Sequence, residues 1–513
     1  MVSLLPVGTP AFRLNLFAAF FMLASLWLLL DVCRKLENTL SEILLMLMGI
    51  FFLFNRSVFA EALTAKGCVY ALSLLVLSGL LWLSMKSFAP KAFISLGWFI
   101  WSVGMGNHWQ TEILLIPFLC LWAYQSNERL DPKKIFILLS WILLGLSLYL
   151  YLPLRTSSGV LPCWGNPVSP RGFYWVVSRQ LVRGSENWIQ PLSFYAHSAQ
   201  WELKSLAFYW APGFGFVALL GAVMLWRKDR ALFLRFLFFC VPLVTAVLLV
   251  HEERNQYLVP VYLISAAGIT LVFGFLGIQW IVGRSNSPQG RTLAFVLLFI
   301  VGTGWGFYVF QNENKNGYLL EEDFGINVLK AIPQDGLLLA DGDPYVMSIW
   351  YQKYARGLRP DIVFEPSIFL YHDWGWRQLT AQSPDLREAI DSSNLFVGRV
   401  VALTELSRKH PFFNSLGREY LAPVLKEVPG HWVPKGLIYE WRQGIPPHEK
   451  LKGNFDFVSR MERYRGLSME PNLSMLDESS RQIYGYYALQ HSVMADFLKK
   501  SPGQFFNRKI MGF

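Results

Sequence analysis

Long apolar stretches follow one another along the first 310 residues, and no stretch of that kind occurs in residues 311–513. Each is close to the length at which an α-helix crosses the ~30 Å hydrocarbon core of a bilayer. The pattern therefore predicts a polytopic α-helical membrane domain at 1–310 and a second domain at 311–513. About ten spans are predicted, at roughly 12–30, 40–55, 68–85, 92–106, 111–124, 135–152, 208–226, 231–250, 257–280 and 292–310.

The second domain has the pattern of a soluble α/β domain ending in helices. GLLLADGD at 336–343 predicts a buried strand, 344–357 an amphipathic helix and 361–370 a second strand, and 477–500 has apolar positions at helical spacing. Asp343 followed by Pro344 is typical of an N-cap and a first helical residue. Capping therefore competes with a metal or catalytic role for the two carboxylates of this DGD sequence.

The distribution of charged residues predicts the orientation of the membrane domain in the bilayer. The formal net charge of +10 lies entirely in the first 310 residues, which hold 22 Lys and Arg against 12 Asp and Glu. The basic residues lie in alternate loops, on one side of the predicted membrane domain. By the positive-inside rule these loops are predicted to be cytoplasmic. The excess thus indicates topology and lipid contact, not nucleic-acid binding. The loops contain Arg34 and Lys35; Lys86 and Lys91; Arg129, Lys133 and Lys134; Arg227, Lys228 and Arg230; Arg284 and Arg291.

The other, external face is predicted to carry the polar segments. These are 55–62, 106–112, the long loop 153–207, 251–257 and everything after residue 310. Ionisable groups at a membrane boundary are costly and commonly face a cavity or a partner. If the chain has an active face, we expect it to be the external one.

The loop LPLRTSSGVLPCWGNP at 152–167 follows directly on an apolar span and combines an arginine with aromatic residues. Arg155 can extend to lipid headgroups, or it can donate two hydrogen bonds to a phosphate. Arg171 and Arg179 follow, interleaved with aromatic side chains. Arginines and aromatics beside a membrane suit a lipid-linked phosphate that carries a sugar, although an interfacial aromatic belt has the same composition.

Three other polar segments lie at the same predicted boundary, and each also has a structural interpretation. GNHWQTE can form a self-bonded polar cap or face a cavity; Glu61 can pair with a neighbour or act chemically; and HEERNQY can be a solvated hairpin. The residues concerned are Asn107, His108, Glu112, Glu61, Arg254 and Tyr257.

Cofactor motifs are missing from the sequence. The five cysteines are scattered and have neither zinc-ligand spacing nor the arrangement of a disulfide framework. No phosphate-binding glycine motif occurs at a strand–helix junction. The sequence therefore requires no cofactor, and a divalent metal is compatible with it but unsupported.

Four segments together resemble a known family. GNHWQTEILLIPFLCLWAY, YLYLPLRTSSGVLPCWGNPVSPRGFYWVVSRQ, NQYLVPVYLISAAGITLVFGF and LLADGDPYVMSIWYQKYARGLRPDIVFEPSIFL look like the domain-of-unknown-function 2723 family. That family is related to a eukaryotic protein O-mannosyltransferase and is placed among the class C glycosyltransferases. The resemblance runs from about residue 3 to residue 380, and the last hundred or so residues match less clearly.

The resemblance implies an enzyme that takes a sugar from a polyprenyl phosphate on the external side of the membrane. Arg155 matches the arginine of the family's Leu-Pro-Leu-Arg motif and would bind the donor phosphate, with Arg171 and Arg179 beside it. Arginine would stabilise the charge that develops on the departing phosphate without transferring a proton. The residues expected to line the cavity are Asn107, His108, Trp164, Asn166, Arg254 and Tyr257.

One departure from the family concerns the catalytic base. Family members begin with a further helix and an external acidic loop, whose carboxylate is the expected general base. The present sequence starts after that region, and its first aspartate is Asp31, on the predicted cytoplasmic side. Three explanations stay open: an N-terminally shortened sequence, a degenerate enzyme, or another carboxylate as base. Glu61 and Glu112 are weak candidates for such a carboxylate.

The function expected from these residues and from the resemblance is transfer of a sugar, mannose being one candidate, from a polyprenyl-phosphate donor to a protein or glycan hydroxyl. The alternative is a non-catalytic or degenerate membrane scaffold or carrier for lipid-linked saccharides. The expected partners are the bilayer, the lipid-linked donor and the acceptor. The prokaryotic members of the family favour a bacterial inner membrane, with the C-terminal domain in the periplasm.

Overall fold

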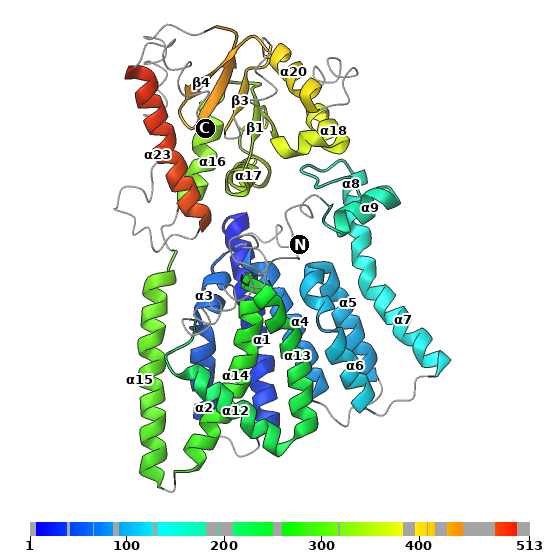
Figure 1. Ribbon diagram of the computed structural model, residues 1–513, viewed down its shortest axis with the longest axis vertical. Coiled ribbons are helices and arrows are strands. Elements are labelled where there is room, and N and C mark those ends of the chain that lie inside the picture. Colours follow the sequence, from blue (N-terminus) through cyan, green and yellow to red (C-terminus); the bar gives the residue numbers. More distant parts are fainter. Residues whose placement is uncertain are drawn as a thin grey trace. The chain divides into compact units, whose positions relative to one another are not determined.

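The computed structural model describes most of the chain (Figure 1). The residues described are 7–37, 42–64, 66–85, 92–126, 131–180, 193, 209–249, 259–285, 287–315, 319–382, 396–407, 409–415, 428–444 and 478–499.

The chain forms two compact units, and the second is discontinuous in sequence. Unit 1 consists of Met1–Leu152 and Arg179–Asn314, and unit 2 of Pro153–Ser178 and Lys315–Phe513. The apolar pattern predicts the whole loop 153–207 as part of the membrane domain. The structure differs here, because residues 153–178 pack against the C-terminal part of the chain.

Unit 1 is helical. Its helices are α1 (Pro10–Leu36), α2 (Glu42–Leu53), α3 (Arg56–Ala62), α4 (Gly67–Ser84), α5 (Ala92–Ile113), α6 (Ile116–Gln125), α7 (Pro132–Leu146) with η2 (Ser147–Leu150), α12 (Phe214–Lys228), α13 (Arg230–Leu249), α14 (Val259–Gly283) and α15 (Pro288–Glu313). The helix α8 (Tyr151–Ser157) carries the chain from η2 into unit 2.

Five helical segments of the described residues are long and apolar enough to cross a membrane, and α2 with α3, bent by 66°, adds a sixth if the pair is one span. The five are Pro10–Leu36, Gly67–Ser84, Pro132–Ser157, Tyr262–Gly283 and Pro288–Glu313. The chain is therefore a polytopic membrane protein, while the number of ten spans stays a prediction.

Three of these long helices begin with the same local signal. Thr9, Asp131 and Ser287 each accept a hydrogen bond from a backbone N–H of the first turn, and a proline follows each of them directly. The side-chain oxygen satisfies an N–H that has no partner inside the helix, and proline loses nothing at the first position. The starts of these helices are thus encoded locally.

The middle of unit 1 is formed by α1, α4 and α14, and the outer helices expose apolar side chains. Leu29, Leu74 and Leu271 are at most 2% exposed, whereas Phe136 on α7 and Phe307 on α15 are 71% and 68% exposed. Exposed apolar side chains on membrane-spanning helices are lipid-facing, because hydrocarbon chains solvate them as well as protein does.

The ends of several helices meet at one end of unit 1. Lys228 at the end of α12 donates to the carbonyl oxygen of Leu36 (3.1 Å), the last residue of α1. Arg235 on α13 donates to the carbonyl oxygen of Ser84 (2.7 Å), the last residue of α4. Three of the predicted basic loops follow or link these helix ends, which agrees with their placement on one side. We call this the basic end of unit 1; its cytoplasmic location stays a prediction.

Unit 2 contains a five-stranded mixed sheet between helices. Its elements are α9 (Pro170–Val177), α16 (Leu320–Ala331), β1 (Leu337–Ala340), α17 (Asp343–Trp350), η3 (Tyr351–Ala355), β2 (Val363–Pro366), η4 (Ser367–Tyr371), α18 (Asp373–Ala381), α20 (Phe396–Leu406), β3 (Phe412–Asn414), β4 (His431–Lys435), β5 (Ile438–Arg442) and α23 (Glu478–Lys499). The strand order is β2-β1-β3-β5-β4, in which β1 is parallel to β2 and β3, and β5 is antiparallel to β3 and β4.

Helices cover both faces of this sheet, as Figure 1 shows. One face buries Leu337, Leu339 and Phe412 with side chains of α18 and α20. The other face buries Leu338 and Phe413 with side chains of α16, α17 and α23. The parallel strands are consequently buried on both faces, which explains why their sequences are continuous apolar runs.

The predicted strand–helix–strand order from 336 to 370 is present, with three local differences. The strand expected at 361–370 spans only Val363–Pro366 and is followed by the 3-10 helix η4. The helix expected at 344–357 ends as an α-helix at Trp350 and continues as one π-helical turn, η3. Asp343 is the first residue of α17 and not its N-cap, which is Gly342. Gly342 has a φ of +85°, a conformation that glycine adopts without strain, so the chain turns into the helix one residue earlier than predicted.

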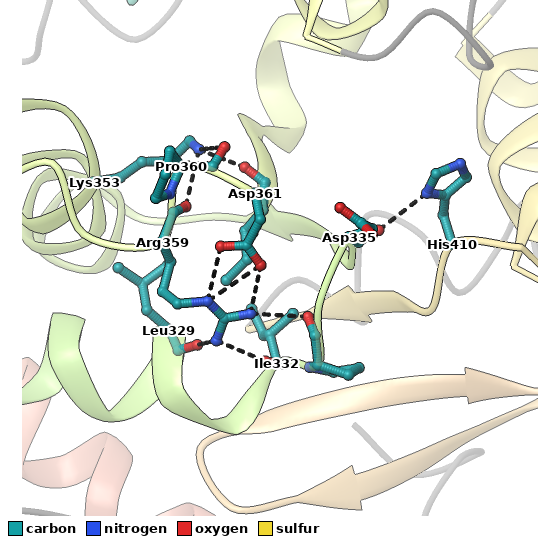
Figure 2. A network of polar contacts seen from close by, with 10 residues as sticks. Leu329, Ile332, Asp335, Lys353, Arg359, Pro360, Asp361 and His410 are labelled. Atoms are coloured by element: carbon teal, nitrogen blue, oxygen red, sulfur yellow. Dashed lines mark hydrogen bonds and ion pairs between the residues drawn. The ribbon is translucent and has the colours of Figure 1, made fainter.

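Arg359 joins the connections around β1 and β2, as Figure 2 shows. Its guanidinium donates to the carbonyl oxygens of Leu329 and Ile332 at the end of α16 (both 2.8 Å) and to that of Pro333 (3.0 Å). It also pairs with Asp361 (2.8 Å) and thereby holds the pKa of that carboxyl below its usual range. Carbonyls at a helix C-terminus favour a cation, so this one side chain closes α16 and orders the loop before β2.

Candidate functional site

In unit 1 the candidate residues gather around a break in α5. His108 has non-helical φ and ψ of −145° and 75° within that helix, and its Nδ1 lies 2.8 Å from the hydroxyl of Thr111. Asn107 donates from Nδ2 to the carbonyl oxygen of Val69 (2.8 Å) and to Ser73 Oγ (2.9 Å), on the first turns of α4. The predicted polar turn is thus a distorted helix whose amide is anchored to the neighbouring helix.

Two cations act on this histidine. The guanidinium of Arg179 and the ammonium of Lys66 both interact electrostatically with the His108 ring. Lys66 Nζ lies 5.5 Å from the centre of the Tyr70 ring, and that ring lies 6.4 Å from the His108 ring. We call Lys66, Tyr70, Asn107, His108 and Arg179 the cationic cluster.

The cationic cluster lies at the end of α4 away from the basic end. Val69 and Ser73 belong to the first turns of α4, whereas Ser84 ends it among the basic loops. A helix of 18 residues is about 27 Å long at 1.5 Å per residue. These cations therefore lie nearly a membrane thickness from the basic end.

The two candidate carboxylates of unit 1 have different surroundings. Glu61 is half-buried at the end of α3, and its Oε2 accepts a hydrogen bond from the Thr64 hydroxyl (3.2 Å). Glu112 is fully buried, and neither carboxyl oxygen has a hydrogen-bond partner among the described residues. An added Cβ on Gly104 would lie 2.8 Å from the Glu112 carboxyl carbon, so this glycine makes room for it. Of the two, Glu61 is the one that is partly exposed.

In unit 2 the Arg155 loop is folded on itself. Arg155 Nη1 donates to the carbonyl oxygen of Pro162 (2.9 Å) and lies 3.6 Å from the sulfur of Cys163. The other guanidinium nitrogens make no hydrogen bond within the part of the chain that the structure describes. Arg171 and Asn166 are exposed. Nη1 of Arg155 therefore holds the loop in shape, and the other guanidinium nitrogens are available to a ligand.

Aromatic contacts attach this loop to the rest of unit 2. The Trp164 ring meets those of Phe369 and Trp350 edge to face, with centroids 5.1 and 6.2 Å apart. Trp175 on α9 contacts the rings of His372 and Trp374 at 5.2 and 5.9 Å. Such edge-to-face pairs are favourable beyond the apolar area that they bury. Trp164 is thus partly consumed in packing and is 40% exposed.

A buried amide–carboxyl network, which no sequence motif indicates, completes the attachment. The backbone N–H of Cys163 donates to Gln378 Oε1 (2.8 Å), and Gln378 Nε2 donates to Glu365 Oε1 (2.6 Å). Gln382 Nε2 donates to Glu365 Oε2 (3.1 Å). Glu365 is fully buried on β2. A pattern of residue types could not reveal the network, because one of its donors is a backbone group.

Glu365 makes the stability of unit 2 depend on pH. Burial raises the pKa of its carboxyl well above the usual range, against the effect of the two glutamine hydrogen bonds. The folded state therefore keeps the proton to a higher pH than the unfolded chain, whose glutamates titrate near pH ~4.3. The resulting contribution of Glu365 to the free energy of unfolding is complete below the pH at which the unfolded chain titrates, and it is lost as the pH rises. We expect the melting temperature of unit 2 to fall between pH 5 and pH 8. In Glu365→Gln the melting temperature should depend less steeply on pH. An equally steep slope in Glu365→Gln would contradict the assignment.

The predicted site residues are thus divided between the two units. Unit 1 brings Arg179, Asn107 and His108 together, and unit 2 holds Arg155, Trp164, Asn166 and Arg171. Lys66, the N-cap residue of α4, and Tyr70 in its first turn were not predicted as site residues. Arg254 and Tyr257 lie outside the described residues. Among the residues that are described, no three His, Cys, Asp or Glu side chains are placed to hold a metal ion.

Comparison with known proteins finds similar proteins both in sequence and among solved structures. No family model matches the chain. It is 22% identical over 528 aligned residues to the protein O-mannosyl-transferase TMEM260 of Mus musculus, which covers 91% of this chain and 71% of that protein. Two of the similar solved structures are of ArnT from Cupriavidus metallidurans, each 10% identical to this chain. The form bound to undecaprenyl phosphate has a TM-score of 0.49 and covers 83% of this chain and 84% of ArnT. The apo form has a TM-score of 0.43 and covers 85% of each.

The sequence similarity extends along nine-tenths of the chain and agrees with the predicted resemblance to membrane glycosyltransferases. The narrower resemblance to the domain-of-unknown-function 2723 family stays a prediction. In sequence, the chain is similar to a protein O-mannosyl-transferase, and its own helices are those of a polytopic membrane protein.

Proposed function

We propose that the chain is a membrane glycosyltransferase that moves a sugar, mannose being the first to test, from a polyprenyl-phosphate donor to a hydroxyl of a protein or glycan. The observation that carries the proposal is the cationic cluster. Two cations beside a histidine and an anchored asparagine, near a membrane boundary, suit a phosphate whose lipid tail stays in the bilayer. The similarity to a protein O-mannosyl-transferase supports the choice of sugar and acceptor.

The residues suggest how the transfer would be divided among them. The bond between the sugar C1 and the phosphate oxygen breaks, and a bond forms between C1 and the acceptor oxygen. The polyprenyl phosphate leaves with the additional negative charge, which Arg179 and Lys66 would stabilise at fixed positions. The acceptor hydroxyl loses its proton to a base, for which we propose Glu61, the partly exposed carboxylate of the two predicted. The external face of the membrane, in a bacterium the periplasmic one, is the proposed side of the reaction.

The test uses the full chain in lipid nanodiscs with polyprenyl-phosphate [³H]mannose and an acceptor peptide rich in serine and threonine. We expect kcat/KM to fall at least ~100-fold in Arg179→Gln, the size of loss seen when one preorganised charge donor is removed. Arg230→Gln, an arginine at the basic end that lies over Trp226, is the matched control and should retain wild-type activity. Equal activity of Arg179→Gln and the control would overturn the assignment of the cluster.

A second measurement separates the enzyme from a carrier of lipid-linked saccharides. Binding of polyprenyl phosphate is measured for the wild type, Lys66→Gln and Arg179→Gln. Binding that is weakened in both variants, together with turnover by the wild type, supports the transferase. Tight binding without turnover on any acceptor would support a carrier or a degenerate enzyme.

A further inference from the structure

The parallel strands of unit 2 have an arrangement at which ligands commonly bind. In the order β2-β1-β3, the connections that leave β1 and β2 cover opposite faces of the sheet. Ile349 of α17, between β1 and β2, packs on one face. Leu379 of α18 and Leu403 of α20, between β2 and β3, pack on the other. In such sheets ligands bind beyond the carboxyl ends of the strands between which the connections diverge, here β1 and β3.

Three polar side chains lie at or just beyond those carboxyl ends. Asn414 ends β3, Asp341 follows β1 and Ser367 follows β2. Asn414 is paired with Leu339 of β1 and is two residues from Phe412, so its side chain lies on the face that α18 and α20 cover. Ser367 directly follows the pair Ala340–Pro366, and its hydroxyl lies within hydrogen-bonding reach of the Asp341 carboxyl. We call Asp341, Ser367 and Asn414 the switch-point cluster.

Polar atoms of the switch-point cluster are buried, and those of Asn414 lack a partner among the described residues. Asn414 and Ser367 are 2% and 1% exposed. Both side-chain amide atoms of Asn414 make no hydrogen bond to any residue that the structure describes, and the Ser367 hydroxyl has only the Asp341 carboxyl as a polar partner. Buried polar groups are nearly always satisfied in native proteins, and a group of orphans at one place indicates a missing partner.

The chemistry of the cluster selects the kind of partner. A carboxyl accepts, an amide donates and accepts, and a hydroxyl does both, which suits a ligand with several hydroxyl groups. Asp341 makes no ion pair within the described residues. Because none of their cations is paired with this carboxyl, the cluster does not favour an anionic ligand over a neutral one. The indole N–H groups of Trp350 and Trp374 are also buried without partners among these residues, and both rings contact Phe369, two residues after Ser367.

We propose that the switch-point cluster binds a neutral saccharide at the carboxyl ends of β1 and β3, with Asp341, Ser367 and Asn414 as its hydrogen-bonding residues. The inference goes beyond the transferase and does not depend on it, because it concerns recognition by unit 2. Burial raises the pKa of Asp341 to about 6. Its carboxylate is therefore ionised at neutral pH and accepts hydrogen bonds from hydroxyl groups most strongly there.

The test is saturation-transfer NMR on the full chain in nanodiscs, with methyl α-mannopyranoside, methyl β-glucopyranoside and methyl β-galactopyranoside as probes. We expect at least one glycoside to bind, and Asn414→Leu to weaken it at least tenfold. Gln490→Leu is the matched control, since Gln490 is another buried amide, with an unpartnered Oε1, on α23. The Gln490→Leu variant should bind the glycoside as tightly as the wild type does. Arg179→Gln should also keep the binding, which separates this site from any site for the donor's sugar.

Two results would overturn the proposal. One is that none of the three glycosides receives saturation from the wild type. The other is that Asn414→Leu binds as the wild type does and melts at a higher temperature, as expected for a buried amide satisfied only by water. Asn414→Leu removes no hydrogen bond between described residues, so we expect it to fold. Asp341→Asn and Ser367→Ala are smaller changes that should weaken the same binding several-fold.

Discussion

Replacing Gln378 with leucine is expected to destabilise unit 2 by about 3 kcal/mol, since the change leaves one oxygen of a buried carboxyl and a backbone N–H without their partner. In the native protein Gln378 accepts from Cys163 and donates to Glu365, which is fully buried. Gln382 retains its own bond to Glu365 but reaches only the other carboxyl oxygen. The lost hydrogen bonds therefore weaken both strand β2, which carries Glu365, and the attachment of the loop that contains Cys163.

Hydrogen exchange read by mass spectrometry can locate this effect. Peptides that contain Cys163 and Trp164 should lose protection together with those of β2, because one side chain holds both. Arg377→Leu, on the exposed part of the same helix, is the control and should change protection little. Loss of protection in β2 with an unchanged loop would show that Gln378 does not hold the loop in place.

Replacing Arg359 with alanine is expected to cost a similar amount, about 3 kcal/mol, because three charge-assisted hydrogen bonds and an ion pair are lost together. The carbonyls at the end of α16 lose their cation, and Asp361 loses its partner. Arg359→Lys should recover only part of the loss, since an ammonium cannot reproduce the planar fork.

The measurement for Arg359 is the protection of amides in α16 and β1 in the full chain. Arg356→Ala provides the comparison: Arg356 lies three residues earlier and makes one longer pair with Glu322 (3.5 Å), in which both side chains are about one-third exposed. Such a surface pair contributes about 0–1 kcal/mol. If Arg356→Ala and Arg359→Ala reduce protection equally, the helix-closing role of Arg359 is wrong.

The features that could be predicted from the sequence depend on local composition. The apolar runs around Leu337 and Val363 predict β1 and β2, since strands buried on both faces must be apolar throughout. The spans that begin at Pro10, Pro132 and Pro288 are visible from their length and hydropathy. Among site residues, the grouping of Asn107 with His108 follows from their adjacency in one motif.

The features that could not be predicted depend on contacts between distant residues. The strand β3 has three residues, Phe412–Asn414, too few for a periodic signal, and its place beside β1 comes from tertiary packing. Lys66 joins the candidate site only because α5 is bent at His108 and brings that ring to α4. The attachment of the Arg155 loop to unit 2 depends on the backbone N–H of Cys163, which any residue but proline would supply.

The discontinuous make-up of unit 2 has a consequence during synthesis of the protein. Cys163 and Gln378 are 215 residues apart in the chain, and ribosomes add about 5–20 residues per second. The loop at 153–178 must therefore remain for on the order of ten seconds or longer after it is made before its partner strands exist. During that interval Trp164 and Trp175 lack the rings that cover them in the folded protein. Nascent chains arrested between residues 178 and 337 should accordingly be the most sensitive to proteases and the most dependent on chaperones.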